Sequence, residues 1–492
     1  MTRFVTRIGG TCLHILQTQP LFAWDALEDS PSIKTLRQLL TVIPDQALLN
    51  SLRQARGHGR NEYPVSVLWG VLLLTIALRH TSIEACLQEL QRNGALRQLL
   101  GIEHESQVPK KWNISRFLAV LGQSPHRELL TDVFNQMIQV LGVTVEDLGQ
   151  RLAGDSTALC ARGQKTGVVA GSSQASPTGK GPRLLALPVI DQPVPQACDQ
   201  GLAVPTGGRK EYTDEHGVVT RVVTWTGYKL HLLVDAVNEV VIAYRISSAH
   251  VGDNTQLPPL LQDAKANLPA GRITSLAYDK ACDDQATHLL LYQQHIHPII
   301  QSRRLWKDEF ERMLPGHDGH SNIVYDEAGS VYCYDKVSQP PVRHKMSYMG
   351  REAKRGTLKY RCPAAHYGLA CPSMGRCNQD RPYGLTVRVK QEIDLRHFPP
   401  VPRSTRQFEK LYKGRTAVER VNARLKLFWG ADDGNITGAR RFYSYVGTVM
   451  VVHAAFATLL AAAPRRGTKT AGKLGTLHLG KVQKALQDKL HL

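Results

Sequence analysis

Cysteine is scarce in this chain. Nine of the 492 residues are cysteine, an odd number with uneven spacing. Disulfide scaffolds use closely spaced, paired cysteines in short secreted chains, so we exclude a disulfide framework and expect a reducing, cytoplasmic location. The first ten residues also lack the order of a signal peptide, because Arg3 and Arg7 alternate with short apolar pieces.

Long hydrophobic runs are nearly absent as well. The run at 65–78 is shorter than the roughly 18–20 residues that a membrane-spanning helix needs. The run at 446–463 is just long enough, and arginines flank it on both sides. His453 and the small residues at 461–463 favour a helix buried in protein over a membrane span. We therefore expect no membrane partner, with a basic protein anchored by this run as the alternative.

Acidic residues are outnumbered. The chain has 42 Asp and Glu against 61 Lys and Arg, a net charge of +19 and a pI near 9.6. Such an excess predicts a polyanionic partner, with nucleic acid as the first candidate and an anionic membrane surface as the second. The length exceeds that of one domain of roughly 100–200 residues. The 42% hydrophobic and 21% charged content excludes a collagen-like, coiled-coil or wholly disordered chain.

The N-terminal part is predicted to be all-helical. Residues 63–143 carry apolar side chains at helical spacing, with helix starts predicted at Pro64, Ser82, Ser115 and Pro125. Short helices joined by tight turns would suit a helix-turn-helix reader of DNA. A packed helical bundle explains the pattern equally well.

From Leu152 the pattern changes to that of a mixed α/β sheet. Asp155 lies in GDST at the end of a first strand, and the Gly/Ser/Pro-rich residues 163–217 predict a long loop. Two β-branched runs, 218–234 and 239–246, predict a hairpin. The pattern then predicts a helix at 254–265, a strand at 272–278, a helix at 286–295 and a strand at 297–301. Acids at strand ends in this order indicate a mixed sheet.

Residues 302–401 form a strongly basic segment. Seven basic residues between 343 and 361, among them Arg351, Lys354 and Arg355, are opposed by one acid. Such a run can be solvated surface, but it has the sign of the whole chain and therefore favours nucleic-acid contact.

The same segment contains a candidate zinc site. Cys333, Cys362, Cys371 and Cys377, with His366 between them, are potential ligands, and zinc needs four. None of the spacings is a compact CxxC pair. Zinc and scattered free cysteines both remain open.

A polar stripe is predicted near the C-terminal end. Tyr412, Arg415, Glu419, Asn422 and Lys426 follow one another in steps of three and four, which places them on one side of a helix. A stripe of this composition should face solvent or a polar ligand. Glu419, beside several basic residues, can also be a simple ion-paired surface residue.

Three acids stand out by position: Asp155, Asp279 and Glu419. Asp279 is preferred over its neighbours Asp283 and Asp284 because an apolar strand runs directly into it. Three carboxylates brought together need a compensating cation, and oxygen ligands select Mg²⁺ or Mn²⁺. A pair of such ions can support cleavage of a phosphodiester, and the basic surface would bind the substrate.

These residues resemble a known family. Tyr412-x2-Arg415-x3-Glu419-x6-Lys426 resembles the Tyr-Arg-Glu-Lys signature of DDE transposases of bacterial insertion sequences. The blocks GDST and AYDKACDD resemble those that hold the first two acids, and YPVSVLWGVLLLTIALRHTSIEACLQEL resembles the N-terminal domain that precedes the catalytic domain. The resemblance spans residues 45–463.

The resemblance implies an α/β, ribonuclease-H-like catalytic domain with a mixed sheet. The expected units are a helical DNA-binding domain at 1–150, the catalytic domain at 151–301 and 402–463, a basic cysteine-containing insertion at 302–401 and a basic tail at 464–492.

The resemblance also implies roles for single residues. Asp155, Asp279 and Glu419 would hold Mg²⁺ or Mn²⁺. Tyr412 and Arg415 would contact the DNA at the element's end, and Lys426 a backbone phosphate. Asn422, Arg351, Lys354 and Arg355 complete the expected DNA-binding residues.

The expected function is metal-dependent strand cleavage at insertion-sequence ends and strand transfer into target DNA. The expected partners are double-stranded terminal repeats, target DNA and a second copy of the chain on paired ends, at the bacterial nucleoid. The alternative is a catalytically inactive, transposase-derived DNA-binding protein, which would have no use for the three acids.

Overall fold

The computed structural model describes most of the chain between residues 31 and 462. The described residues are 4–8, 11–15, 31–57, 62–161, 168–170, 201–213, 219–303, 305–307, 310–316, 322–379, 381–432 and 436–462. The predicted tail at 464–492 and most of the predicted loop at 163–217 lie outside them.

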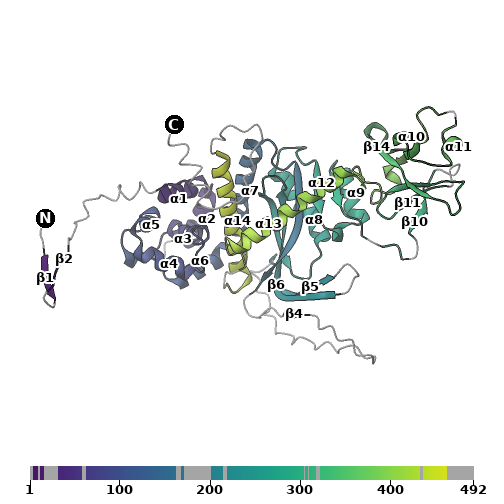
Figure 1. The fold of residues 1–492 in the computed structure, drawn as a ribbon. Helices are drawn as coiled ribbons and strands as arrows, with labels where there is room; N and C mark the ends of the chain where they lie inside the picture. Colours follow the sequence, from purple (N-terminus) through teal and green to yellow (C-terminus); the bar gives the residue numbers. More distant parts are fainter. Residues whose placement is uncertain are drawn as a thin grey trace, which may run out of the picture.

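The N-terminal part is helical, as predicted (Figure 1). A hairpin of β1 (Phe4–Ile8) and β2 (Thr11–Ile15) precedes seven helices: α1 (Pro31–Val42), α2 (Gln46–Arg56), α3 (Val65–Ala77), α4 (Ile83–Arg92), α5 (Gly94–Leu99), α6 (Lys111–Leu121) and α7 (His126–Thr144). Pro64, Ser82 and Pro125 are N-cap residues, so these predicted starts are confirmed. Ser115 lies inside α6, where the prediction is wrong because the Asn113 side chain accepts the Lys110 N–H and begins the helix earlier.

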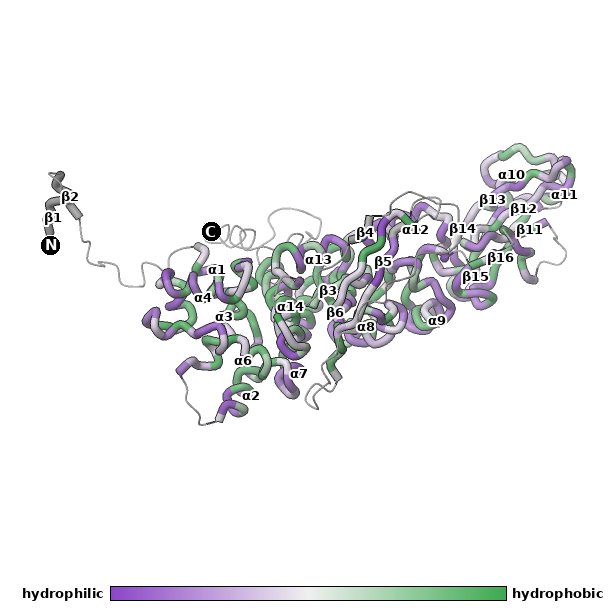
Figure 2. The backbone as a smooth tube through the Cα atoms, turned by 90° about the horizontal axis from the view of Figure 1, so that it is seen from below, coloured by the Kyte–Doolittle hydropathy of each residue, from purple (hydrophilic) through white to green (hydrophobic). Residues whose placement is uncertain are grey.

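A long apolar helix, α14 (Ala439–Ala462), lies at the centre of the molecule. It is long and apolar enough to cross a membrane, but 89% of its apolar window is buried inside the protein. It packs against α1, α3, α6 and α7 and also against β7 (Val241–Ser248) of the main sheet. Figure 2 shows hydrophobic residues concentrated along α3 and α14. The helix is therefore a core helix, as preferred from the sequence.

The main sheet has seven strands among the described residues. They are β3 (Arg151–Cys160), β4 (Val168–Ala170), β5 (Thr206–Thr213), β6 (Val219–Asp235), β7, β8 (Ser275–Tyr278) and β9 (His297–Ile300). The central order is β7-β6-β3-β8-β9, in which β8 and β9 run parallel to β3, and β6 is antiparallel to both β3 and β7. The predicted mixed sheet and the hairpin of β6 and β7 are confirmed.

The predicted loop at 163–217 is partly wrong. It contains β4 and β5, which both pair with the first half of the long strand β6. The sequence TGGRKEYT of β5 has no apolar alternation. Its strand conformation depends on backbone hydrogen bonds to β6, a long-range partner that local sequence does not reveal.

Helices cover both faces of the sheet. They are α8 (Asp253–Asn267), α9 (Gln285–Gln293), α12 (Arg406–Tyr412) and α13 (Thr416–Leu427), and the 3₁₀ turns η4 (Lys280–Cys282) and η7 (Lys413–Arg415) lie beside them. Ser156 of β3 contacts α8, whereas its neighbour Asp155 faces η7. Because successive side chains of a strand alternate between faces, α8 and α13 lie on opposite faces of the sheet.

Buried side chains of the described residues form one large core, a separate smaller core and a small cluster of Ala277, Ile299, Val401 and Phe408. The large cluster runs from the N-terminal helices through α14 to the main sheet, so no gap in packing occurs at residue 150. The smaller cluster, from Leu314 to Phe398, lies among two small antiparallel sheets (Figure 1). Their elements are β10 (Glu311–Met313), β11 (Ile323–Asp326), β12 (Val331–Tyr334), β13 (Arg343–Lys345), β14 (Ser347–Glu352), β15 (Thr357–Arg361), β16 (Thr386–Lys390), α10 (Pro363–Tyr367) and α11 (Met374–Asn378).

Candidate active site

The strand register places Asp155 and Asp279 side by side. Ala153 of β3 is aligned with Ala277 of β8 in the parallel pair. Two residues further along each strand, Asp155 and Asp279 are level with one another and point to the same face. β8 ends at Tyr278 whereas β3 continues to Cys160, so Asp279 lies where the sheet opens beside β3.

Gly154 allows the two strands to approach in this way. A Cβ atom at this position would lie 2.1 Å from the Cε2 atom of Tyr278. The Tyr278 ring is fully buried against the backbone of Gly154. The glycine of GDST is therefore required by packing, directly before Asp155.

Helix α13 brings the third acid to the same face. It buries Ala417, Val418, Val421 and Leu425 and packs against β3 and β6. Its orientation is held by ion pairs at the turn after β6, where Glu239 accepts from Arg420 Nε at 2.8 Å and from Arg424 Nη2 at 2.7 Å. These two arginines therefore pair with Glu239 and not with Glu419, whose side chain is half exposed.

One guanidinium lies among the three acids. Arg415 Nη2 is 2.7 Å from Glu419 Oε1, and Arg415 Nη1 is 3.9 Å from Asp155 Oδ2. Partial burial would lower the pKa of Arg415, but negative charge on Tyr412, Glu419, Asp155 and Asp279 raises it overall. Asp155, Asp279 and Glu419 thus all lie near the Arg415 guanidinium, although Asp155 and Glu419 are 264 residues apart in sequence.

Asp155 has the most perturbed environment of the three acids. Burial, with a smaller contribution from the nearby Asp253, raises the pKa of its carboxyl to about 6. The Ser156 N–H, which donates to Oδ1 at 2.8 Å, and the cations Lys210 and Arg415 act in the opposite direction. The carboxylate is therefore incompletely compensated by the protein.

The rival acids Asp283 and Asp284 have structural partners. Asp283 is buried and accepts from Arg396 Nε at 2.9 Å and Arg403 Nη2 at 2.7 Å, and it lies 3.0 Å from His288 Nε2. Asp284 is the N-cap of α9. Asp279 is thus the acid of this segment that remains beside Asp155.

The polar stripe is only partly open. Tyr412 stacks on Phe408, and Arg415 and Glu419 face the acids. Asn422 is buried with its Oδ1 unpaired among the described residues, and Lys426 donates to the carbonyl of Ala158. The stripe is predicted to face solvent or a polar ligand. Asn422 does not face solvent, because it is buried on α13, which packs against β3 and β6.

Sequence reasoning missed a fourth acid beside Asp155. Asp253, the first residue of α8, accepts from Ser156 Oγ at 2.8 Å, and it lies 3.5 Å from both Lys229 Nζ and His231 Nδ1. A signal was present in the sequence. Lys229 and His231 are polar residues at alternate positions of an otherwise apolar strand, which marks one face of that strand as polar.

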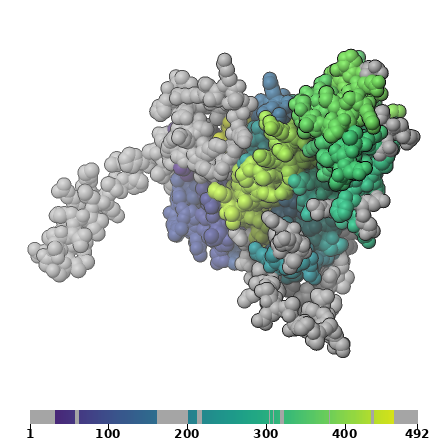
Figure 3. All heavy atoms as spheres, turned by 45° about the vertical axis from the view of Figure 1, so that its right-hand side comes forward, coloured from purple at the N-terminus to yellow at the C-terminus, as the bar shows by residue number. Residues whose placement is uncertain are grey.

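The basic run is exposed. Arg351, Lys354 and Arg355 lie at the surface of the small domain, where Arg351 Nε donates to Gln391 at 2.8 Å and Arg355 lies 3.7 Å from Glu352. In Figure 3 the atoms of α12 and α13 lie at the surface next to this green domain. A DNA strand crossing the acids could therefore reach the basic run.

The four cysteines of the small domain are free and close to one another. Burial raises the pKa of Cys333 to about 12, with contributions from Cys362, Cys371 and Cys377. His366 is a neighbour of Arg361.

Within the described ranges, no three His, Cys, Asp or Glu side chains are arranged to hold a metal ion. At the acids, the Arg415 guanidinium supplies the positive charge between Asp155 and Glu419. The donor set itself, carboxylate oxygens around an undercompensated Asp155, fits Mg²⁺ or Mn²⁺.

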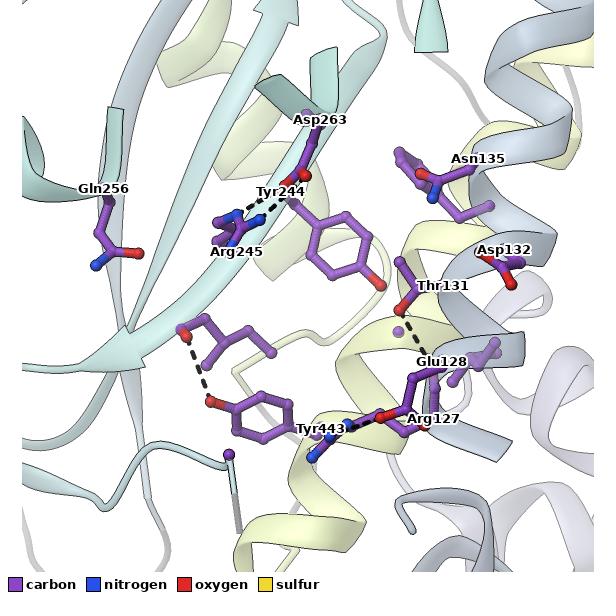
Figure 4. Close-up of a pocket in the computed structure, with 16 residues that line it drawn as sticks. Arg127, Glu128, Thr131, Asp132, Asn135, Tyr244, Arg245, Gln256, Asp263 and Tyr443 are labelled. Carbon is purple, nitrogen blue, oxygen red and sulfur yellow. Dashed lines mark hydrogen bonds and ion pairs between the residues drawn. The ribbon is translucent and has the colours of Figure 1, made fainter. Parts of the chain in front are cut away.

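A pocket of about 420 Å³ lies apart from the acids, between α7, α14 and the β7 side of the sheet (Figure 4). The ion pair of Arg245 with Asp263 forms one wall and Tyr443 another. As far as the described residues show, none of the three acids lines it.

Two families match parts of the chain. The family described as Transposase DDE domain matches residues 191–454, and the family described as Transposase domain (DUF772) matches residues 24–119. No curated protein matches the chain. The first match covers more than half of the chain and contains Asp279 and Glu419. Asp155 lies outside both matches, so its place in the site rests on the strand register.

Proposed function

The chain belongs to the Transposase DDE domain family, and we propose that it cleaves DNA at the ends of a bacterial insertion sequence and transfers the strands into target DNA. β3, which carries Asp155, pairs antiparallel with β6 and parallel with β8. This pairing, within the strand order β7-β6-β3-β8-β9, supports a ribonuclease-H-like catalytic domain.

The observation that carries the proposal is the convergence of Asp155, Asp279 and Glu419 around Arg415. We assign these acids as the ligands of Mg²⁺ or Mn²⁺. Such ions, when bound, activate an attacking oxygen and stabilise the leaving oxygen of a phosphodiester. The protein's own contribution is to hold three carboxylates together, Asp155 on β3, Asp279 at the end of β8 and Glu419 on α13.

Arg415 is proposed to bind DNA beside the scissile bond. A guanidinium can form two parallel hydrogen bonds to a phosphate. When Arg415 turns to DNA, its contacts with Glu419 and Asp155 are released and both carboxylates become free for the metal. Tyr412, next to it, is proposed to stack on a displaced base.

Lys426 and Asn422 are proposed as further DNA contacts. Asn422 is buried, and the partly exposed Lys426 donates to the Ala158 carbonyl of β3 and lies 3.4 Å from Asp432. Their contact with DNA would need a shift of α13 relative to β3.

The proposed partners are double-stranded terminal repeats, target DNA and a second copy of the chain. The net charge of +19 and the exposed Arg351, Lys354 and Arg355 support DNA binding. The N-terminal helices, which match a transposase domain, are proposed to contribute to it. The proposed place of action is the bacterial nucleoid.

We also propose that zinc binds the thiols of Cys333, Cys362, Cys371 and Cys377. The support is that four free thiols, from β12 to α11, gather at one small core. Zinc would draw them into tetrahedral contact and stabilise the small domain. Metal analysis that finds no zinc in protein purified without chelators would refute this.

The central test is strand cleavage by the purified chain on its element's terminal repeats with Mg²⁺. Asp155→Asn, Asp279→Asn and Glu419→Gln should each abolish cleavage while end binding stays nearly intact, because each removes a charge at constant size. Combined losses should not add, since the acids act as one unit. Glu409→Gln, which changes an exposed acid of α12, is the matched control and should cleave normally.

The same gel separates the alternatives. An inactive DNA-binding protein would bind the ends and leave them uncut in the wild type. A variant among the three that still cleaves at the wild-type rate would remove that residue from the site.

A further inference from the structure

A row of buried polar side chains lies on the face of β3 opposite to Asp155. The register sets Ser156 of β3 directly opposite His231 of β6, and Ala158 opposite Lys229. Ser156, His231 and Lys229 therefore point to the α8 side of the sheet. Asp253 at the start of α8 lies against all three.

The three contacts of Asp253 leave half of its carboxylate unused. Ser156 Oγ at 2.8 Å, Lys229 Nζ at 3.5 Å and His231 Nδ1 at 3.5 Å all lie against the same oxygen, Oδ1. In the part of the chain that the structure describes, no hydrogen bond reaches Oδ2. The side chain is 15% exposed and is thus accessible at its outer end.

One buried polar atom beside these acids has no partner among the described residues: the Tyr278 hydroxyl. Burial raises the pKa of Tyr278, and Asp253, Asp155 and Asp279 add to the increase. His231 is fully buried, and its Nδ1 lies 3.5 Å from Asp253 Oδ1. A buried hydroxyl without a partner is unfavourable, which favours a further polar group at this place.

The two faces of the sheet meet at this point. β8 ends at Tyr278, so no strand lies beside Asp155 and Ser156 on that edge of β3. The edge is covered again only further along, where Lys426 binds the carbonyl of Ala158 and Asp432 accepts the N–H of Cys160. A ligand at the open edge can therefore be reached both from Asp155 on one face and from Asp253 on the other.

We propose that Asp253 is a fourth carboxylate of the active site and binds the divalent cation together with Asp155. The inference rests on the proposed function. Lys229 and His231 are positioning residues, which hold Oδ1 and direct Oδ2 toward the open edge. The competing role, in which Asp253 only ties α8 to β3 through Ser156, makes a different prediction for metal affinity.

The test measures Mg²⁺ binding to the DNA-free chain by calorimetry, beside the Mg²⁺ concentration for half-maximal cleavage. Asp253→Asn keeps the acceptor for Ser156 and removes the charge. It should weaken Mg²⁺ binding about 10–100-fold, the range seen when the support of a metal site is removed. Asp253→Glu should restore part of the affinity. Asp263→Asn is the matched control on the same helix, where the acid pairs with Arg245, and should bind Mg²⁺ like the wild type.

A second measurement needs no variant. With hydrogen peroxide and ascorbate added, Fe²⁺ bound in place of Mg²⁺ generates hydroxyl radicals that cut the nearby backbone, so the wild type should be cut at 252–253 as well as at 155–156. Cuts at 155–156 alone, or unchanged Mg²⁺ affinity in Asp253→Asn, would overturn the fourth carboxylate while wild-type cleavage leaves the proposed function standing. A wild type that neither binds Mg²⁺ nor cleaves would overturn both.

Discussion

Among single residues, Asp155 is the candidate site acid whose ionised form lowers the free energy of unfolding. Its side chain is 20% exposed. Burial and the nearby negative charge of Asp253 raise its pKa from 3.8 to about 6. An acid with a raised pKa is held more tightly in its protonated form by the fold than by the unfolded chain. The free energy of unfolding therefore falls as pH rises from about 4 to 6 and stays reduced above that range.

Asp155→Asn should consequently stabilise the metal-free chain at pH 7.5. A shift of about two pKa units corresponds to about 3 kcal/mol, and Asn keeps the acceptor for the Ser156 N–H. Urea unfolding at pH 7.5 and 4 should show a gain that shrinks toward the lower pH. Added Mg²⁺ should stabilise the wild type and leave the variant unchanged. A variant less stable than the wild type at pH 7.5 would show that Asp155 is well compensated by its neighbours.

Among the elements, a buried ion-pair cluster joins the main sheet to the small domain. Asp283, after β8, accepts from Arg396 and Arg403, which lie beyond the small sheets in sequence, and from the N–H of Arg303. Arg403 is buried deeply enough that its pKa falls to about 10 in spite of this partner. The position of the small domain beside the acids thus depends on one carboxylate.

Asp283→Ala should destabilise the chain by about 3–5 kcal/mol, because it leaves the buried Arg403 without its paired carboxylate and leaves Arg396 with the more distant Glu327, at 3.6 Å. Asp284→Ala, which removes only the cap of α9, is the neighbouring control and should cost about 1 kcal/mol. Thermal unfolding of both variants checks the difference. Equal losses would mean that Arg396 and Arg403 find other partners.

For the whole molecule, the excess of positive charge should appear as a salt-dependent affinity for DNA. Each phosphate contact contributes about −0.9 to the slope of log K against log salt on duplex DNA. Replacing Arg351, Lys354 and Arg355 together by Gln should flatten the slope by up to about 3. Binding measured from low to high salt gives this slope directly. An unchanged slope, in a variant that melts like the wild type, would assign the basic run to solvated surface.

The sequence alone predicted the secondary structure around the site and singled out Asp155, Asp279 and Glu419 as its candidate acids. Periodicity placed the strand before Asp279 and the helix carrying Glu419 because these signals are local: an apolar strand that ends in an acid, and polar residues in steps of three and four. The same local signals favoured Asp279 over Asp283 and Asp284, because an apolar strand runs directly into it. They could not show that Arg396 and Arg403, more than 100 residues away, pair with Asp283 in the folded chain.

Only the tertiary structure decided which side chains share a face and which are covered. Asn422 and Lys426 follow Glu419 along one stripe, yet Asn422 is buried and Lys426 donates to the Ala158 carbonyl of β3. Asp253 lies beside Ser156 and His231 because the register of β3 and β6 turns both toward α8. Strand register and helix placement arise from contacts between distant segments, and such contacts leave no periodic signal in the sequence.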